Sequence, residues 1–422
     1  MSTAVTAAGN GSPSAAPKLT ILNMLGIFGL FSFMAEFTIM TPSIAAFSAH
    51  FDGTPFTTIM LANTITGVIG IPMSILAGAT VNKIGYRPMA IVGALIMIFG
   101  GAFPFLMPDL AEYWPVIFSR ILVGVGYGLI FPLGGAFFIL YFKGKKRSQL
   151  LGAGIMVQFG FAILFSLVAG MLTDIAWNYS FLTYLISLVP FVFVAAFLPE
   201  AKHLGAEADK AKAAAQAGTI KQKIPHATYA YIVVFGLVLW MMYIVVNFLA
   251  SIILGERGIG DAGAAGLMAS CFCLGNVASG LLFPHAVGFL KSRTFGVFGI
   301  IAAAGLVVAY LSDSVMMYGT GAFLIGLGGS TVYVAAQNSI GNISPKPRVP
   351  FTNGLLTAAM NLASFFVAYW ITFGQEALPS FGTGAPMVIG AAIVAVTSVV
   401  CLFIPFKGIR MGIAPGTSEE TA

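Results

Sequence analysis

The chain consists of long apolar runs separated by short breaks that are charged or rich in Pro and Gly. Each run holds about 20 residues or more, the length at which a helix rising about 1.5 Å per residue crosses a hydrocarbon core of about 30 Å. The runs are too long and too continuous for the alternating strands of a membrane barrel. The pattern therefore predicts an all-α membrane protein. Twelve transmembrane helices are expected near residues 21–48, 55–80, 88–108, 112–142, 149–173, 177–198, 228–254, 262–287, 294–312, 315–342, 350–374 and 384–406.

The composition agrees with a membrane protein. Of the 422 residues, 58% are hydrophobic and 8% are charged, whereas about 25% of the residues of a typical soluble domain are charged. The mean hydropathy is +0.95. Residues 1–20 are small and polar and predict a disordered tail. The apolar run after this tail is longer than that of a signal peptide, so the first helix is expected to be retained.

The distribution of cations predicts the orientation. With a cytoplasmic N-terminus, 18 of the 20 Lys and Arg residues fall on the cytoplasmic side. Of the other two, Arg257 falls outside and Arg120 lies within the fourth helix. This asymmetry follows the positive-inside rule. We therefore expect a multi-pass protein, placed in a bacterial inner membrane, with both termini in the cytoplasm. The net charge of +6 would face anionic lipid, and nothing in it indicates nucleic-acid binding.

One polar segment divides the chain into two sets of six helices. Residues 199–227 are rich in Ala and Lys and predict a cytoplasmic linker, in which a short amphipathic helix can lie on the membrane surface. The expected organisation is a tail at 1–20, a first bundle at 21–198, the linker, a second bundle at 228–406 and a tail at 407–422. Two helical bundles around a central cavity are a transporter architecture.

Short motifs indicate the family. The loop after the second helix reads GATVNKIGYRP. It resembles the major facilitator signature G-x3-D-[RK]-x-G-x-[RK] at Gly78, Asn82, Lys83, Gly85 and Arg87, with Asn82 in place of the usual Asp. The fourth helix resembles the family pattern R-x3-G-x-G at Arg120, Gly124 and Gly126, and Pro199 and Glu200 end the sixth helix in a family-like way. The resemblance implies two six-helix bundles, alternating access, and gating by the loop at its cytoplasmic side.

Two charges lie in the middle of predicted helices, Glu36 in the first and Arg120 in the fourth. A carboxylate in the bilayer centre costs from about 2.5 kcal/mol upward, so it is expected to face a cavity or a partner. We expect the two residues to form an ion pair. A structural pair that joins two helices is one interpretation. The interpretation we favour is a protonatable coupling site, because burial and a neighbouring Arg shift a carboxyl pKa in opposite directions.

In the family that this chain resembles, helices 1, 4, 7 and 10 line the cavity. On these helices Arg120, Tyr127, Trp240, Tyr243, Asn247, Tyr333 and Gln337 are the candidate solute-binding residues. Each can equally be interhelical packing or hydrogen bonding. The G-x3-G pair at Gly124 and Gly128 is typical of close helix packing.

The remaining chemistry is sparse. The three cysteines form no zinc set, the four His residues are scattered, and the sequence has no G-x4-GK[ST] nucleotide loop. We therefore expect no enzyme activity, metal or cofactor, and energy from an ion gradient or from the gradient of the solute itself. The predicted function is a monomeric secondary transporter of a small organic solute that is coupled to protons. Uptake or exchange of an organic anion is slightly favoured over proton-driven efflux of amphipathic drug-like compounds. A receptor or scramblase that transports nothing is the alternative from another class.

Overall fold

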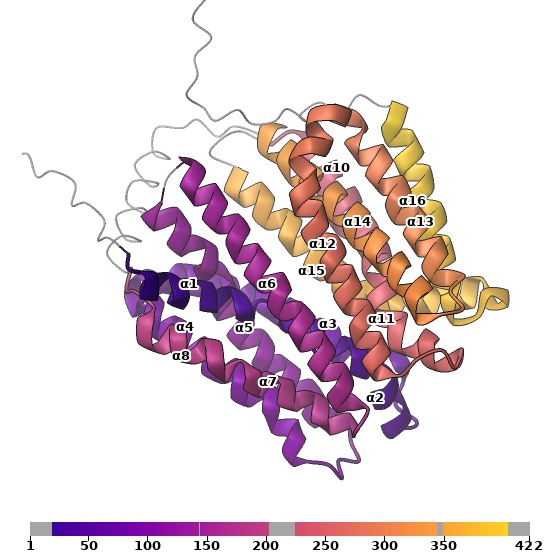
Figure 1. Ribbon diagram of the computed structural model, residues 1–422, viewed down its shortest axis with the longest axis horizontal. Coiled ribbons are helices and arrows are strands. Elements are labelled where there is room, and N and C mark those ends of the chain that lie inside the picture. The colour runs from indigo at the N-terminus through magenta and orange to yellow at the C-terminus, as the bar shows by residue number, and fades with distance from the viewer. Residues whose placement is uncertain (1–18, 143, 202–223, 344–348, 404–422) are drawn as a thin grey trace, which may run out of the picture.

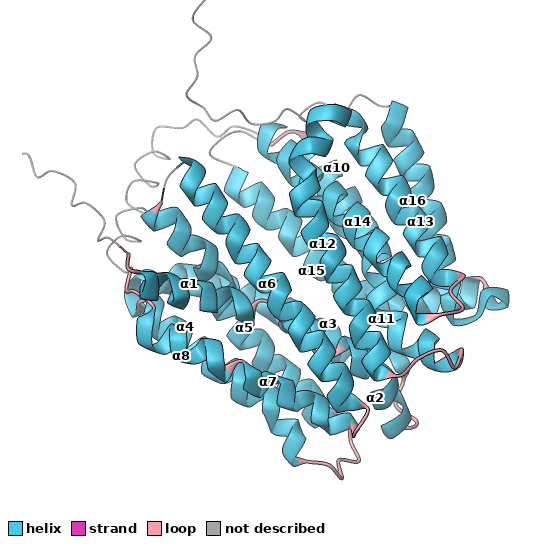
Figure 2. Ribbon diagram, in the orientation of Figure 1, coloured by secondary structure: helices cyan, strands magenta, loops and turns pink. Residues whose placement is uncertain are grey.

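The computed structural model describes residues 19–142, 144–201, 224–343 and 349–403, and every regular element in these ranges is a helix (Figure 2). Twelve helical spans in this part of the chain are long and apolar enough to cross a membrane. This confirms the predicted all-α, twelve-helix architecture. Most of the predicted linker, most of the predicted tail at 1–20 and all of the predicted tail at 407–422 lie outside the described residues.

The first six spans form one half of the molecule. Their elements are α1 (Ile21–Phe33), η1 (Glu36–Thr38), η2 (Thr41–Ser43) and α2 (Ile44–His50), then α3 (Phe56–Ile84), α4 (Tyr86–Ala102), η3 (Phe103–Leu106), α5 (Trp114–Tyr141) and α6 (Gly144–Thr173), and finally η4 (Trp177–Leu182), α7 (Thr183–Ile186) and α8 (Leu188–Phe197).

The second half repeats this plan. It contains α10 (His226–Tyr231), the π-helical η5 (Ile232–Leu239) and α11 (Trp240–Glu256), then α12 (Ala262–Leu290), η6 (Lys291–Arg293), α13 (Thr294–Tyr310) and α14 (Val315–Ile343), and finally α15 (Val349–Ala377), η8 (Pro379–Gly384) and α16 (Ala385–Phe403).

The first span differs from the continuous helix that the sequence predicts at 21–48. α1 ends at Phe33, and two short 3₁₀ turns separate it from α2. Pro42 lacks a backbone N–H and its ring clashes with the preceding turn, which disfavours a continuous α-helix here. The break is supported by α6: Gln158 Nε2 donates to the Met34 carbonyl at 3.2 Å, and Thr38 Oγ1 donates to the Ala162 carbonyl at 3.0 Å. The freed backbone is thus partly satisfied by a neighbouring helix.

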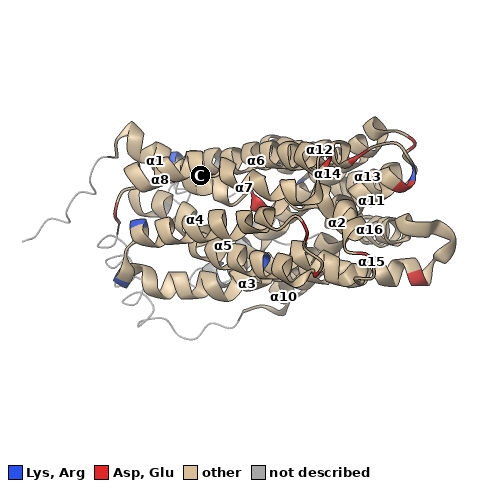
Figure 3. Cartoon of the chain, turned by 90° about the horizontal axis from the view of Figure 1, so that it is seen from below, with Lys and Arg blue, Asp and Glu red and all other residues tan. Residues whose placement is uncertain are grey.

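Figure 1 shows the two halves as two groups of helices, each with its own hydrophobic core. Charge separates the two ends of the bundle. In Figure 3 the red segments lie mostly from the middle of the view to its right, toward one of these ends. We call this the acidic end. It carries the loops and helix ends with Asp52, Asp109, Glu112, Asp174, Glu256, Asp261, Asp313 and Glu376. The opposite end, with Lys83, Arg87, Lys291 and Arg293, is the basic end.

The halves meet mainly through α6 against α12 and α3 against α15. Near the middle of these helices, Ser270 Oγ donates to the Ile163 carbonyl at 3.4 Å. Closer to the acidic end, Ser166 Oγ donates to the Gly266 carbonyl at 2.8 Å. At that end, Asp174 accepts hydrogen bonds from the first two backbone N–H groups of α12 at 3.1 and 3.0 Å. These hydrogen bonds join the halves from mid-membrane to the acidic end and hold them together there.

Candidate functional site

Glu36 and Arg120 form the ion pair that the sequence predicts. The Arg120 Nη2 atom lies 2.7 Å from Glu36 Oε2. Both residues are buried, with 4% of Glu36 and 1% of Arg120 exposed. Glu36 begins η1, at the break of the first span, and Arg120 projects from α5.

The guanidinium of Arg120 is held by further partners from two other helices. Its Nε donates to the Ala62 carbonyl of α3 at 3.0 Å, and its Nη2 donates to Thr66 Oγ1 at 3.1 Å. Its Nη1 donates to the hydroxyl of Tyr184 on α7. Tyr184 in turn donates to Glu36 Oε2 at 3.3 Å, and its ring centre lies 5.4 Å from the guanidinium carbon. A buried charge is tolerated when it is paired and hydrogen-bonded in this way.

Tyr184 is the member of this cluster that sequence reasoning missed. It is fully buried against α4, where a Cβ added to Gly101 would lie 2.5 Å from its ring. In the sequence it is one aromatic residue within an apolar run, 148 positions after Glu36. Nothing in that local pattern distinguishes it from core packing.

The ion pair therefore lies inside the first half. The recorded polar partners of Arg120 come from η1, α3 and α7. All of them belong to residues 21–198. The predicted role of Arg120 as a direct solute ligand stays a prediction, and in this conformation its guanidinium is enclosed by protein.

Three of the aromatic candidates lie in the second half of the molecule and one lies in the first. Trp240 of α11 and Tyr333 of α14 lie together, with ring centroids 5.8 Å apart. Tyr243 is buried in the core of the second half, where a Cβ added to Gly329 would lie 2.8 Å from its ring. Tyr127 packs within the first half, 5.2 Å from the ring of Phe131. Of the remaining candidates, Asn247 is buried on α11 and Gln337 is half-buried on α14.

The motif residues lie at the basic end, where they join α3, α4 and α8. Gly85 has a φ of +116°, a conformation that favours glycine, and it ends α3 and caps α4. Glu200 accepts from the backbone N–H of Tyr86 at 2.9 Å and of Arg87 at 3.3 Å. Arg87 Nη2 donates to the Ala195 carbonyl of α8 at 2.6 Å, where a cation complements the helix C-terminus.

The other three motif residues lie on the last turns of α3. A Cβ added to Gly78 would meet nothing within 4 Å, so this glycine is not required for a close approach. Asn82 and Lys83 lie on the final turn before Gly85. The contacts of Gly85, Arg87 and Glu200 are within the first half. Gating by Gly78, Asn82, Lys83, Gly85 and Arg87 stays a prediction.

Comparison with solved structures shows the fold. A D-xylose-proton symporter superposes with a TM-score of 0.71 over 92% of this chain and 98% of that chain, at 16% sequence identity. A POT family transporter in complex with 5-aminolevulinic acid superposes with a TM-score of 0.65 over 90% of this chain and 95% of that chain, at 13% identity.

Sequence comparison gives the family. The multidrug transporter protein MdtP of Bacillus subtilis (strain 168) is 33% identical over 120 residues, which are 27% of this chain and 20% of that protein. The match thus spans about a fifth of the length of this curated relative. The sequence model of the Major Facilitator Superfamily matches residues 26–260, more than half of the chain. The chain belongs to the major facilitator superfamily, a family of secondary transporters that are not enzymes.

Proposed function

We propose that this secondary transporter couples the movement of a small organic solute to protons, through the carboxylate of Glu36. The observation that carries the proposal is the position of Glu36, a buried carboxylate at a break in the first span. Intramembrane acids of this kind mark proton relays and solute paths. The acidic end is proposed to face outward, with the basic end and both termini in the cytoplasm of a bacterium, and the protein is proposed to act as a monomer.

The two sides of the break are packed against different halves. α1 packs against α8 and α5 of the first half, whereas η2 and α2 also contact α11, and η2 contacts α12. Opening the acidic end must separate η2 and α2 from α11. The backbone between α1 and η2, where Glu36 lies, is the place at which this displacement is absorbed. Protonation of Glu36 would weaken its bond to Arg120, and the two protonation states would then favour different positions of α2.

Of the two solute classes considered from the sequence, the amphipathic compounds receive more support. Arg120, on which binding of an anion would depend, already donates to Glu36, Tyr184, Thr66 and a backbone carbonyl. The aromatic pair of Trp240 and Tyr333 offers an apolar surface in the second half. The short match to a multidrug transporter points the same way. We therefore propose neutral or cationic amphipathic solutes.

Replacement of Glu36 tests the coupling. With a solute found by a thermal-shift screen of metabolites and drug-like compounds, wild-type proteoliposomes should concentrate it about tenfold per coupled proton for each unit of imposed pH gradient. Glu36→Gln should reduce this ratio to about one while solute exchange at equal concentrations continues. Glu36→Asp, whose carboxylate reaches less far toward Arg120, should give an intermediate ratio. Undiminished accumulation by Glu36→Gln would limit Glu36 to a structural counter-ion.

A further inference from the structure

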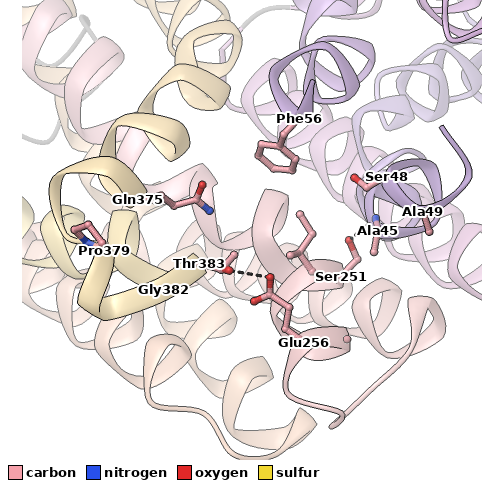
Figure 4. A pocket seen from close by; sticks show the side chains of 12 residues that line it. Ala45, Ser48, Ala49, Phe56, Ser251, Glu256, Gln375, Pro379, Gly382 and Thr383 are labelled. Carbon is pink, nitrogen blue, oxygen red and sulfur yellow. Dashed lines mark hydrogen bonds between the residues drawn. The ribbon is translucent and has the colours of Figure 1, made fainter. Parts of the chain in front are cut away.

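A pocket of about 800 Å³ opens at the acidic end, between the two halves of the molecule (Figure 4). One wall comes from α2 and the start of α3, with Ala45 and Phe56. The other wall comes from α11, α15 and η8, with Ser251, Gln375 and Thr383. The walls touch where the backbone N–H of Ala45 donates to Ser251 Oγ at 3.3 Å. Pockets of about 300–1,000 Å³ are typical of small-ligand sites.

The single ionisable side chain that lines this pocket is Glu256. Its Oε1 accepts a hydrogen bond from Thr383 Oγ1 at 2.8 Å, which holds the carboxylate against η8. The neighbouring cation is engaged elsewhere: Arg257 Nη1 donates to the Ser312 carbonyl at 2.6 Å, and its guanidinium lies 5.9 Å from the ring centre of Tyr310. The structure records no ion pair for Glu256.

The electrostatic surroundings of the pocket favour cations. Eight carboxylates lie at the acidic end, and Arg257 is the one Lys or Arg among the described residues there. Clustered charge of one sign raises the local concentration of oppositely charged ligands. The pocket itself combines one carboxylate with the aromatic ring of Phe56 and several small or apolar residues. An organic cation with an apolar body complements both features.

We propose that this pocket binds an amphipathic organic cation, which pairs with Glu256 and contacts Phe56 on the opposite wall. Because the walls belong to different halves, opening of the acidic end separates them and removes the site. A ligand that binds one conformation better than another shifts the population toward it. The bound cation therefore holds the acidic end closed and inhibits transport. This inference does not depend on proton coupling at Glu36.

Binding of tetraphenylphosphonium to the purified, detergent-solubilised protein tests the site. Glu256→Gln keeps the shape of the side chain and its acceptor for Thr383. At low salt it should weaken binding about tenfold, because it removes one charge contact at a partly solvated site. Glu376→Gln is the matched control, because Glu376 is exposed at the same end and outside the pocket lining, and it should bind within about twofold of wild type. Glu256→Asp, which keeps the charge, should bind more tightly than Glu256→Gln. Equal binding by wild type and Glu256→Gln would overturn the proposal, as would tetraphenylborate, the anion of similar shape, binding as tightly as the cation.

Two measurements test whether the ligand bridges the halves. Phe56→Ala should weaken binding of tetraphenylphosphonium, because it removes the aromatic wall contributed by the first half. Hydrogen exchange should slow in peptides from both walls, at 44–56 and at 250–256, when the ligand is bound. Protection confined to 250–256, or unchanged affinity in Phe56→Ala, would refute bridging and with it the inhibitory role.

Discussion

Tyr184→Phe removes one hydroxyl from the buried cluster and leaves the ring in place. That hydroxyl accepts from Arg120 Nη1 and donates to Glu36 Oε2. Hydrogen bonds to charged groups contribute about 1.5–3 kcal/mol each, and an unsatisfied buried donor adds its desolvation cost. Phe fills the same space against α4, so no cavity is added. We expect Tyr184→Phe to lower the free energy of unfolding by about 3–4 kcal/mol, near the lower limit for two such bonds because the one to Glu36 is long at 3.3 Å.

The measurement is reversible unfolding in mixed detergent micelles, compared with Tyr179→Phe. Tyr179 is half-buried five positions earlier, where its ring packs edge-on against Phe105 with centroids 5.3 Å apart. No hydrogen bond of its hydroxyl is recorded, so Tyr179→Phe should change the free energy of unfolding by about 0.5 kcal/mol or less. If the two variants lose equal stability, the Tyr184 hydroxyl does not belong to the cluster and the account of the buried charge is wrong.

The same cluster predicts non-additivity. In a Glu36→Gln background the Tyr184 hydroxyl no longer bonds to a carboxylate, so Tyr184→Phe should cost less than it does in the wild type. Residues in one hydrogen-bond network show interaction energies of about 0.5–3 kcal/mol in double-mutant cycles. Strict additivity of the two substitutions would show that Tyr184 and Glu36 act independently.

Two other substitutions test the ends of the bundle. Gly85→Ala should lower the free energy of unfolding by about 1–3 kcal/mol, because φ is +116° and the new Cβ would lie 2.7 Å from Glu200 Oε2. Gly78→Ala, with free space around it, should be neutral or stabilising. Equal losses in the two variants would contradict a special role of the Gly85 backbone. At the acidic end, burial and then the neighbouring Asp261 raise the pKa of Asp174 in the closed, folded state. The contribution of Asp174 to stability is therefore greatest at acid pH and is lost as pH rises through that raised pKa. Asp174→Asn should remove this loss. Its free energy of unfolding, measured across pH, should therefore rise relative to that of the wild type as pH increases. A difference between the two proteins that stays constant with pH would contradict the prediction.

The helices and the ion pair were accessible to prediction because both rest on burial free energy. A run of apolar residues has one stable arrangement in a bilayer, and two isolated intramembrane charges of opposite sign have one low-energy arrangement. The break after α1 was not accessible, because the mean hydropathy of a run hardly changes when Thr38 and Pro42 interrupt it. The stabilising partner, Gln158, lies on a helix more than 100 positions away. Contacts of this kind depend on how the helices pack.

The side chain of Arg120 lies on the same face of α5 as the G-x3-G pair. Gly124 and Gly128 follow Arg120 at intervals of four, so all three share one face of α5. A Cβ on Gly124 would lie 2.9 Å from the Thr66 carbonyl of α3, and Arg120 itself donates to the carbonyl of Ala62, one turn away. The glycines bring α5 close to α3, and the guanidinium continues the same line of contact. The face that the G-x3-G pair marks for close packing is therefore the face that encloses Arg120.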